Sequence, residues 1–138
     1  MCNFSEDSLI EQPAIALLAG LGWQTANCFD ETFGEHGSLG RELSSQVGLP
    51  SRLRPALERL NPGLPVKALQ LAIEELTRER GISSPAEANR QVYQLLRDGV
   101  LVTFRDEEGE EQAERVRVID WEHPAQNDFF LASQLWVS

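Results

Sequence analysis

The side chains that could do chemistry are few and lie far apart along this 138-residue chain. Glu11 places a carboxylate near the start of an amphipathic segment. It could close a capping box with Ser8, or it could serve as an accessory acid near a metal site. Asp120 and Asp128 flank a turn late in the sequence, and Asp128 is expected to cap or bond the backbone of that turn. We predict no metal site from these residues.

The histidines and cysteines give no sign of a metal centre. His36 and His123 stand far apart, and neither has a cysteine or a second histidine at metal-ligand spacing. Each is therefore expected to be a surface histidine. Cys2 and Cys28 also lack metal-type spacing, which favours a reduced, cytoplasmic chain.

Charge is distributed unevenly along the sequence. The net charge of −10 argues against a free-standing nucleic-acid binder, because neutralising phosphates needs clustered Lys and Arg. Eight acids and three arginines lie in the stretch 105–122, whereas the stretch 41–80 has seven basic residues and five acids. The two stretches could be ordinary solvated surfaces, or the basic one could meet DNA through Arg52, Arg54 and Arg59. Tyr93 and Trp121 are predicted to be partly buried packing residues rather than a base-stacking platform.

Four helices are expected before any strand. The first spans residues 5–21, with Ser8 as its cap, an apolar stripe through Ile10, Leu17 and Leu21, and Pro13 as a discordant residue. A loop follows over residues 27–40, and Ser38 could cap a short helix over residues 39–47. Further helices are predicted over the ranges 50–60, 65–80 and 84–98; Ser84, Pro85 and Glu87 form a capping box for the last of these, and Gly99 ends it.

The strands are expected in the last third of the chain. The stretch 100–104 should pair antiparallel with 115–120 across an acidic hairpin tip, in which Gly109 can adopt positive φ. The stretch 128–137 is apolar on both faces, as is typical of an interior strand with a neighbour on each edge. Because the sequence stops one residue after Val137, we expect the chain to be the front part of a larger folding unit. Helices first and strands last predict an α+β fold.

Several phrases of the sequence occur in an order that resembles a known family. They include LPSRLRPALERLNPGLP, LLRDGV and VRVIDWEHPAQNDFFLASQLWV, and the similarity runs from about Ser5 to Val137. Together they resemble the N-terminal region of the restriction (R, HsdR-type) subunit of type I restriction–modification enzymes. Each phrase alone is weak, whereas their colinear order is much more specific.

The resemblance implies that residues 1–138 form part of a single PD-(D/E)xK nuclease domain, in which N-terminal helices pack on a small sheet. In that family the metal-binding Asp and the E-x-K motif follow this region, and motor domains that use ATP lie further on. Glu11 matches an acid of the family's opening helix, with an auxiliary catalytic role. The implied partners are DNA and the modification and specificity subunits, and the implied cofactors of the parent enzyme are Mg²⁺ and ATP.

This sequence departs from the family pattern, since it contains no Glu-x-Lys and its one lysine is Lys67. We therefore expect the 138 residues alone to bind no cofactor and to lack nuclease activity. We also expect possible self-association through an open sheet edge, and no association with a membrane. The alternative is a stand-alone, non-catalytic α+β binding module, or an inhibitor whose acidic hairpin imitates the charge of DNA.

Overall fold

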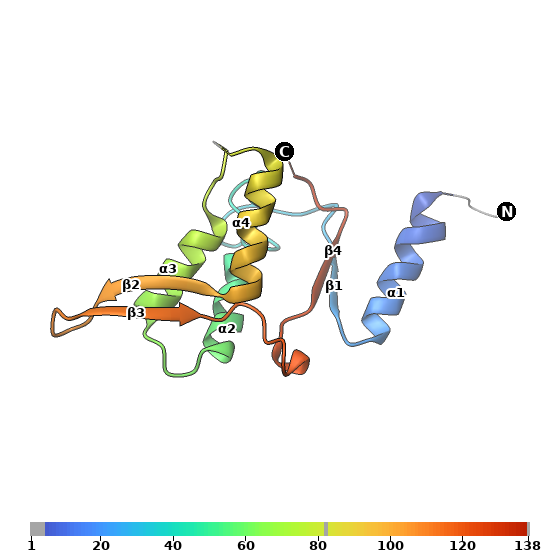
Figure 1. The fold of residues 1–138 in the computed structure, drawn as a ribbon. Coiled ribbons are helices and arrows are strands. Elements are labelled where there is room, and N and C mark those ends of the chain that lie inside the picture. Colours follow the sequence, from blue (N-terminus) through green and yellow to red (C-terminus); the bar gives the residue numbers. More distant parts are fainter. Residues whose placement is uncertain (1–4, 82, 138) are drawn as a thin grey trace. The chain divides into compact units, whose positions relative to one another are not determined.

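The computed structural model describes residues 5–81 and 83–137, so Cys2 lies outside the described residues. It confirms an α+β protein, with helices and two separate two-stranded sheets (Figure 1). The described residues divide into two compact units. The first unit consists of the chain up to residue 46 together with the stretch from residue 128 onward. The second unit comprises residues 47–127.

The first unit is built on two parallel strands that come from opposite ends of the sequence. A π-helical turn, η1 (Asp7–Glu11), leads directly into α1 (Gln12–Gly20), and β1 (Gln24–Asn27) follows. The partner of β1 is β4 (Phe130–Ser133), with Gln24 opposite Phe130. At the entrance of the strand pair, the ring of Trp23 lies 5.1 Å from that of Phe129. This contact packs Trp23 against the residue that precedes β4.

The predicted capping box at Ser8 is wrong. Ser8 lies inside η1, and the residue that precedes this turn, Glu6, already has helical backbone angles. The helix therefore begins earlier than the box requires. A π-helical hydrogen bond runs from the Gln12 amide to the Asp7 carbonyl, just before Pro13. Pro13 follows this wider turn within a helix that runs without a break from Glu6 to Gly20, so the π-helical turn accommodates its ring and missing N–H.

The apolar stripe of the first helix is not covered by the described residues. Ile10, Leu17 and Leu21 are 64%, 65% and 69% exposed, and no residue of α1 is buried. Leu18, on the same helix, is half-buried. An apolar helix of this kind normally packs against another element.

The second unit contains three helices and a hairpin. Its elements are α2 (Pro50–Leu60), α3 (Val66–Thr77), α4 (Pro85–Asp98), β2 (Val100–Arg105), β3 (Glu111–Val116) and the short η2 (Pro124–Gln126). Figure 1 shows β2 and β3 as an extended hairpin. The buried core joins the hairpin to α2 and α3; its members are Leu57, Ala68, Leu69, Ala72, Ile73, Val100, Val102 and Val116.

The local signals around α4 are confirmed. The Ser84 hydroxyl accepts a hydrogen bond from the Glu87 amide at 3.2 Å, and Pro85 occupies the first helical position. Gly99 ends the helix at φ 85°, a conformation that disfavours other residues. A Cβ atom at Gly99 would also stand only 2.8 Å from the Val116 carbonyl oxygen, so this glycine permits the close passage of β3.

Three predictions about regular structure are wrong. No helix forms over residues 39–47, and Ser38 instead bonds Thr32, including a 3.1 Å bond from the Thr32 amide. The strand expected over residues 115–120 is β3, which ends at Val116 because the chain then turns away.

The last strand is the third of these predictions. The stretch 128–137 was expected to be one long interior strand, whereas β4 has four residues, all half-buried. It ends at Ser133 because Gln134 adopts φ 55°. Its described neighbour is β1, a polar segment whose sequence has no strand periodicity. The sequence consequently predicted the strand but not its partner.

Candidate active-site region around Glu11

The structure brings Glu11 to a residue 123 positions away in the sequence. The Gln134 side-chain amide donates hydrogen bonds to both Glu11 carboxylate oxygens, at 2.9 Å to Oε1 and 2.7 Å to Oε2. Glu11 comes from η1, and Gln134 stands directly after β4, so both belong to the first unit. A single NH₂ group thus bonds both oxygens of the carboxylate and holds it in one orientation.

Gln134 has an unusual backbone. Among the described residues it is the only non-glycine residue with positive φ, at 55°. Such a conformation costs an ordinary side chain on the order of 1–2 kcal/mol, so surrounding contacts must hold it. The contact with Glu11 is one of them. The αL turn also redirects the chain after β4, which is why the apolar pattern of residues 135–137 does not continue the strand.

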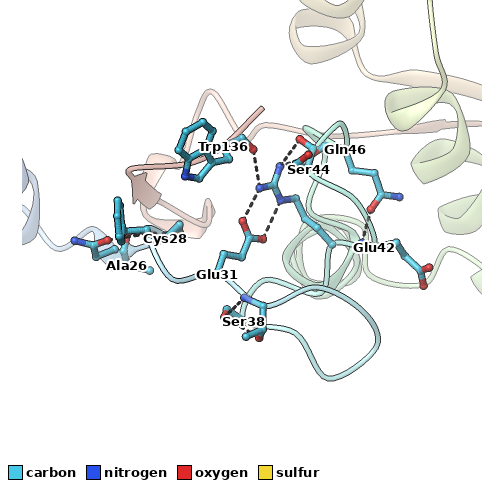
Figure 2. Close-up of polar contacts among 12 residues, drawn as sticks. Ala26, Cys28, Glu31, Ser38, Glu42, Ser44, Gln46 and Trp136 are labelled. Carbon is cyan, nitrogen blue, oxygen red and sulfur yellow. Dashed lines mark hydrogen bonds and ion pairs between the residues drawn. The ribbon is translucent and has the colours of Figure 1, made fainter. Parts of the chain in front are cut away.

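Arg41 fixes the segment that follows Gln134. Its side chain is fully buried and makes five hydrogen bonds, one for each N–H of the guanidinium. Two reach Glu31, at 2.9 Å from Nε and 2.5 Å from Nη2. The other three reach the carbonyl oxygens of Ser44, Gln46 and Trp136, at 3.1, 2.7 and 2.9 Å. Figure 2 shows Glu31 and these carbonyls converging on the guanidinium.

The electrostatics of this centre follow from the pairing. The hydrogen bonds from Arg41 hold the pKa of Glu31 below its ordinary value, and those to Glu31 raise the pKa of Arg41. Burial, with the negative charge of Glu31 nearby, raises the pKa of the Cys28 thiol, so that thiol is not an activated nucleophile. Arg41 was missed by the sequence reasoning, because an arginine in a glycine-rich loop has no pattern that marks it as buried.

In the second unit, Asp120 caps the late turn. The Asp120 carboxylate oxygen Oδ1 accepts from the amides of Glu122 and His123, at 3.1 and 2.9 Å. The Asn127 side chain bonds the backbone amide and carbonyl of Asp120, at 2.8 and 2.9 Å. The His123 amide is the main cause of a lowered Asp120 pKa. Asp120 and Asn127 are thus engaged in holding a turn, and the role expected for Asp128 stays a prediction.

Asn61 supports the exit of the hairpin in a similar way. Its buried side-chain amide accepts from the Arg117 amide at 2.7 Å and donates to the Arg117 carbonyl at 2.8 Å. This pair of bonds takes the place of a neighbouring strand at that point of the chain. Asn61 lies in LPSRLRPALERLNPGLP, one of the segments that carry the family resemblance. Part of that segment therefore has a structural role.

The candidate DNA-binding arginines lie on α2 but not on one face of it. At 100° per residue, Arg52 and Arg59 are nearly in line, whereas Arg54 points about 160° away from Arg52. Arg59 Nε donates to the Gln126 carbonyl at 2.9 Å, although the side chain remains exposed. These positions leave the DNA-binding assignment as a prediction.

Two exposed aromatic residues correct the sequence analysis, and the histidines confirm it. Tyr93 and Trp121 are 60% and 63% exposed rather than packed, and the Arg97 guanidinium carbon lies 5.6 Å from the centroid of the Tyr93 ring. His36 and His123 are exposed, as expected.

In the described part of the chain, no three His, Cys, Asp or Glu side chains gather as metal ligands would. Nor does any helix there have the length and apolar character needed to cross a membrane.

Comparison with known proteins defines the class of this α+β chain. Residues 3–138 match the family described as "Type I restriction enzyme R protein N terminus". The chain therefore belongs to this family, and the resemblance noted in the sequence is confirmed.

Two curated relatives carry the same region. The "Type I restriction enzyme HindI endonuclease subunit" of Haemophilus influenzae is 36% identical over 126 residues, which is 91% of this chain. The "Putative type I restriction enzyme MjaIXP endonuclease subunit" of Methanocaldococcus jannaschii is 30% identical over 137 residues, or 98% of this chain. The chain spans 12% of the length of each relative. No solved structure matches it significantly.

Proposed function

We propose that this chain is the N-terminal part of the nuclease domain of a type I restriction enzyme R subunit. The parent enzyme would translocate DNA with ATP and cut it with Mg²⁺, in the cytoplasm and together with modification and specificity subunits. The observation that carries this proposal is the family match over residues 3–138, with relatives named as endonuclease subunits. That match favours the nuclease over a stand-alone binding module or an acidic inhibitor.

Within this proposal, Glu11 is an auxiliary acid and Gln134 orients it. The two hydrogen bonds of 2.9 and 2.7 Å support this pairing, because they fix a carboxylate at the exit of β4. The chain that follows β4 is further held by the bond from Arg41 to the Trp136 carbonyl. An acid fixed in this way can bind an inner-shell water of a metal ion or orient a neighbouring ligand. The primary metal ligands are not among these 138 residues, which contain no Glu-x-Lys.

A cleavage assay tests the proposal. The purified 138-residue chain should not cut DNA in Mg²⁺, whereas the complete R subunit in its complex should cut in Mg²⁺ and ATP. In that complex, Glu11→Gln should slow cleavage by about 10–100-fold, as substitutions of supporting residues at metal sites do. ATP hydrolysis should remain unchanged.

Gln134→Leu should produce part of the same defect and raise the Mg²⁺ concentration needed for half-maximal cleavage. Glu107→Gln, in the exposed hairpin tip, is the matched control and should leave cleavage unchanged. Robust cutting by the 138-residue chain, lost on changing Glu11, would contradict the proposal.

The three arginines of α2 remain our candidates for phosphate contacts. If Arg52, Arg54 and Arg59 each neutralise one phosphate, changing any of them to Gln should lower the salt dependence of DNA affinity by about one unit of slope. Equal slopes for the wild type and the variants, measured from 50 to 200 mM salt, would remove them from the DNA surface.

A further inference from the structure

The stretch that follows β4 has little packing of its own to fix its path. Residues 134–137 have no regular secondary structure, and of their side chains only that of Leu135 is half-buried. Trp136 and Val137 are 65% and 54% exposed although they are apolar. Gln134 nevertheless adopts a positive φ, which a residue with a side chain keeps only where its surroundings enforce it. Hydrogen bonds are therefore the main constraint on this stretch.

Two hydrogen bonds anchor the backbone on either side of Gln134. On the strand side, the Cys28 amide, directly after β1, donates to the Ser133 carbonyl at 2.8 Å. On the far side, Arg41 Nη2 donates to the Trp136 carbonyl at 2.9 Å. The bend at Gln134 lies between these two fixed carbonyl groups. Its conformation consequently depends on both anchors, of which only the first belongs to the strand pair.

Arg41 can serve as an anchor because its own loop holds it. Four of its five hydrogen bonds stay within that loop, two to the Glu31 carboxylate and two to the carbonyls of Ser44 and Gln46 (Figure 2). The Phe33 ring also lies 5.5 Å from the guanidinium carbon, within cation–π range. The fifth hydrogen bond is the one to the segment after β4. A planar group with five fixed donors suits this arrangement, whereas a lysine has three donors at one point.

We propose that Arg41 is a positioning residue for Glu11. By fixing the Trp136 carbonyl it stabilises the bend at Gln134, and this bend presents the Gln134 amide to both Glu11 carboxylate oxygens. No described hydrogen bond joins Arg41 to Glu11, so the effect passes through the backbone of residues 134–136. The inference rests on the proposed function, in which Glu11 supports cleavage, although the contact itself is a property of the chain.

Two variants separate positioning from a purely structural role of the buried pair. Arg41→Met with Glu31→Leu, the apolar double variant, replaces the ion pair by apolar side chains of comparable size, which buried sites often accept. It keeps the site filled but removes the donor to the Trp136 carbonyl. Glu31→Gln is the matched control, because it removes a charge from the same pair and leaves the Arg41 donor in place.

NMR spectra of the 138-residue chain give the direct readout. In the wild type, the side-chain amide protons of Gln134 should show nuclear Overhauser contacts with the Glu11 side chain. These contacts should persist in Glu31→Gln and be lost in the apolar double variant. The contacts between β1 and β4 should remain in both variants, which shows that the first unit is still folded.

Cleavage by the complete R subunit in its complex tests the route from Arg41 to Glu11. The apolar double variant should slow Mg²⁺-dependent cleavage by about tenfold, at the lower end of what supporting residues contribute at metal sites. ATP hydrolysis should be unchanged. Adding Gln134→Leu should slow cleavage by less than about twofold more, because both changes remove the same contact. Effects of independent residues would multiply instead.

Three results with the variants would overturn the proposal. They are a Gln134–Glu11 contact that survives in the apolar double variant, an equal loss of that contact in Glu31→Gln, and effects on cleavage that multiply. A fourth needs no substitution: in the wild-type chain, a scalar coupling across the hydrogen bond from Arg41 to the Trp136 carbonyl should be observed, and its absence would remove the anchor. The proposal thus stays falsifiable even if the apolar double variant does not fold.

Failure of the proposed function would be recognised separately. A wild-type complex that does not cut DNA in Mg²⁺ and ATP, or a Glu11→Gln variant that cuts like the wild type, would contradict the function proposed for Glu11. The NMR contacts would still decide whether Arg41 positions the Glu11 carboxylate, because they are measured without any cleavage.

Discussion

At the scale of residues, polar side chains hold the irregular parts of both units together. Arg41 is the clearest example, with all five guanidinium N–H groups bonded and no exposed surface. Asn61, Asp120 and Asn127 similarly replace backbone partners where regular structure ends. Two of the segments that carry the family resemblance contain Asn61, Asp120 and Asn127, so part of the resemblance reflects structural constraints.

The Arg41–Glu31 pair gives a prediction for stability. Arg41→Met leaves the Glu31 carboxylate buried without its partner, so it should lower the free energy of unfolding by about 3–5 kcal/mol. Adding Glu31→Leu removes that uncompensated charge, and the double variant should be more stable than Arg41→Met alone. Urea denaturation measures both. Additive losses in the two single variants would contradict the interpretation that the pair acts as one unit.

The same pair predicts a pH dependence. Because Arg41 holds the folded-state pKa of Glu31 below its ordinary value of 4.5, the stabilisation is present above pH 4.5 and is lost as the pH falls through the folded-state pKa. The free energy of unfolding should therefore fall as the pH is lowered below 4.5. Glu31→Gln should flatten this slope without abolishing it, because Asp98, Asp106 and Asp120 also have lowered pKa values.

At the scale of elements, the local signals of the second unit and its tertiary packing agree. The cap at Ser84, the stop at Gly99 and the hairpin turn at Gly109 all occur where the sequence predicts them. The apolar face of α3 covers the hairpin and α2 packs on α3, and the inward residues of the hairpin complete the same core. Such agreement between local preference and packing is what allows a sequence to be interpreted segment by segment.

Alanine substitutions at two glycines should distinguish the cost of backbone strain from the cost of steric contact. Gly63 and Gly99 have nearly the same φ, 88° and 85°, but a Cβ at Gly63 meets nothing within 4 Å. Gly63→Ala should therefore cost about 1–2 kcal/mol, from the backbone alone. Gly99→Ala should cost more, because its Cβ also collides with the Val116 carbonyl at 2.8 Å. If thermal or urea denaturation showed equal losses of stability in the two variants, β3 would be able to move away from the added Cβ.

At the scale of the whole molecule, the two units have very different interiors. The second has a continuous apolar core, whereas no residue of α1 in the first is buried and Leu17 is 65% exposed. An apolar helix surface of this kind is expected to pack against another element. Within the proposed function, the remainder of a much longer R subunit would cover it, since this chain spans 12% of its relatives. The complete subunit should therefore protect α1 from amide exchange more strongly than the isolated chain does.

The sequence by itself determined the α+β class, the three helices and the hairpin of the second unit, and the family. These depend on local patterns: apolar periodicity, caps, glycine stops and the order of short phrases. Only the tertiary structure decided that β1 pairs with β4, that Gln134 holds Glu11 and that Arg41 is buried. Each of these contacts joins residues that have no local pattern of their own. Their partners stand up to 123 positions away, so only the folded chain brings them together.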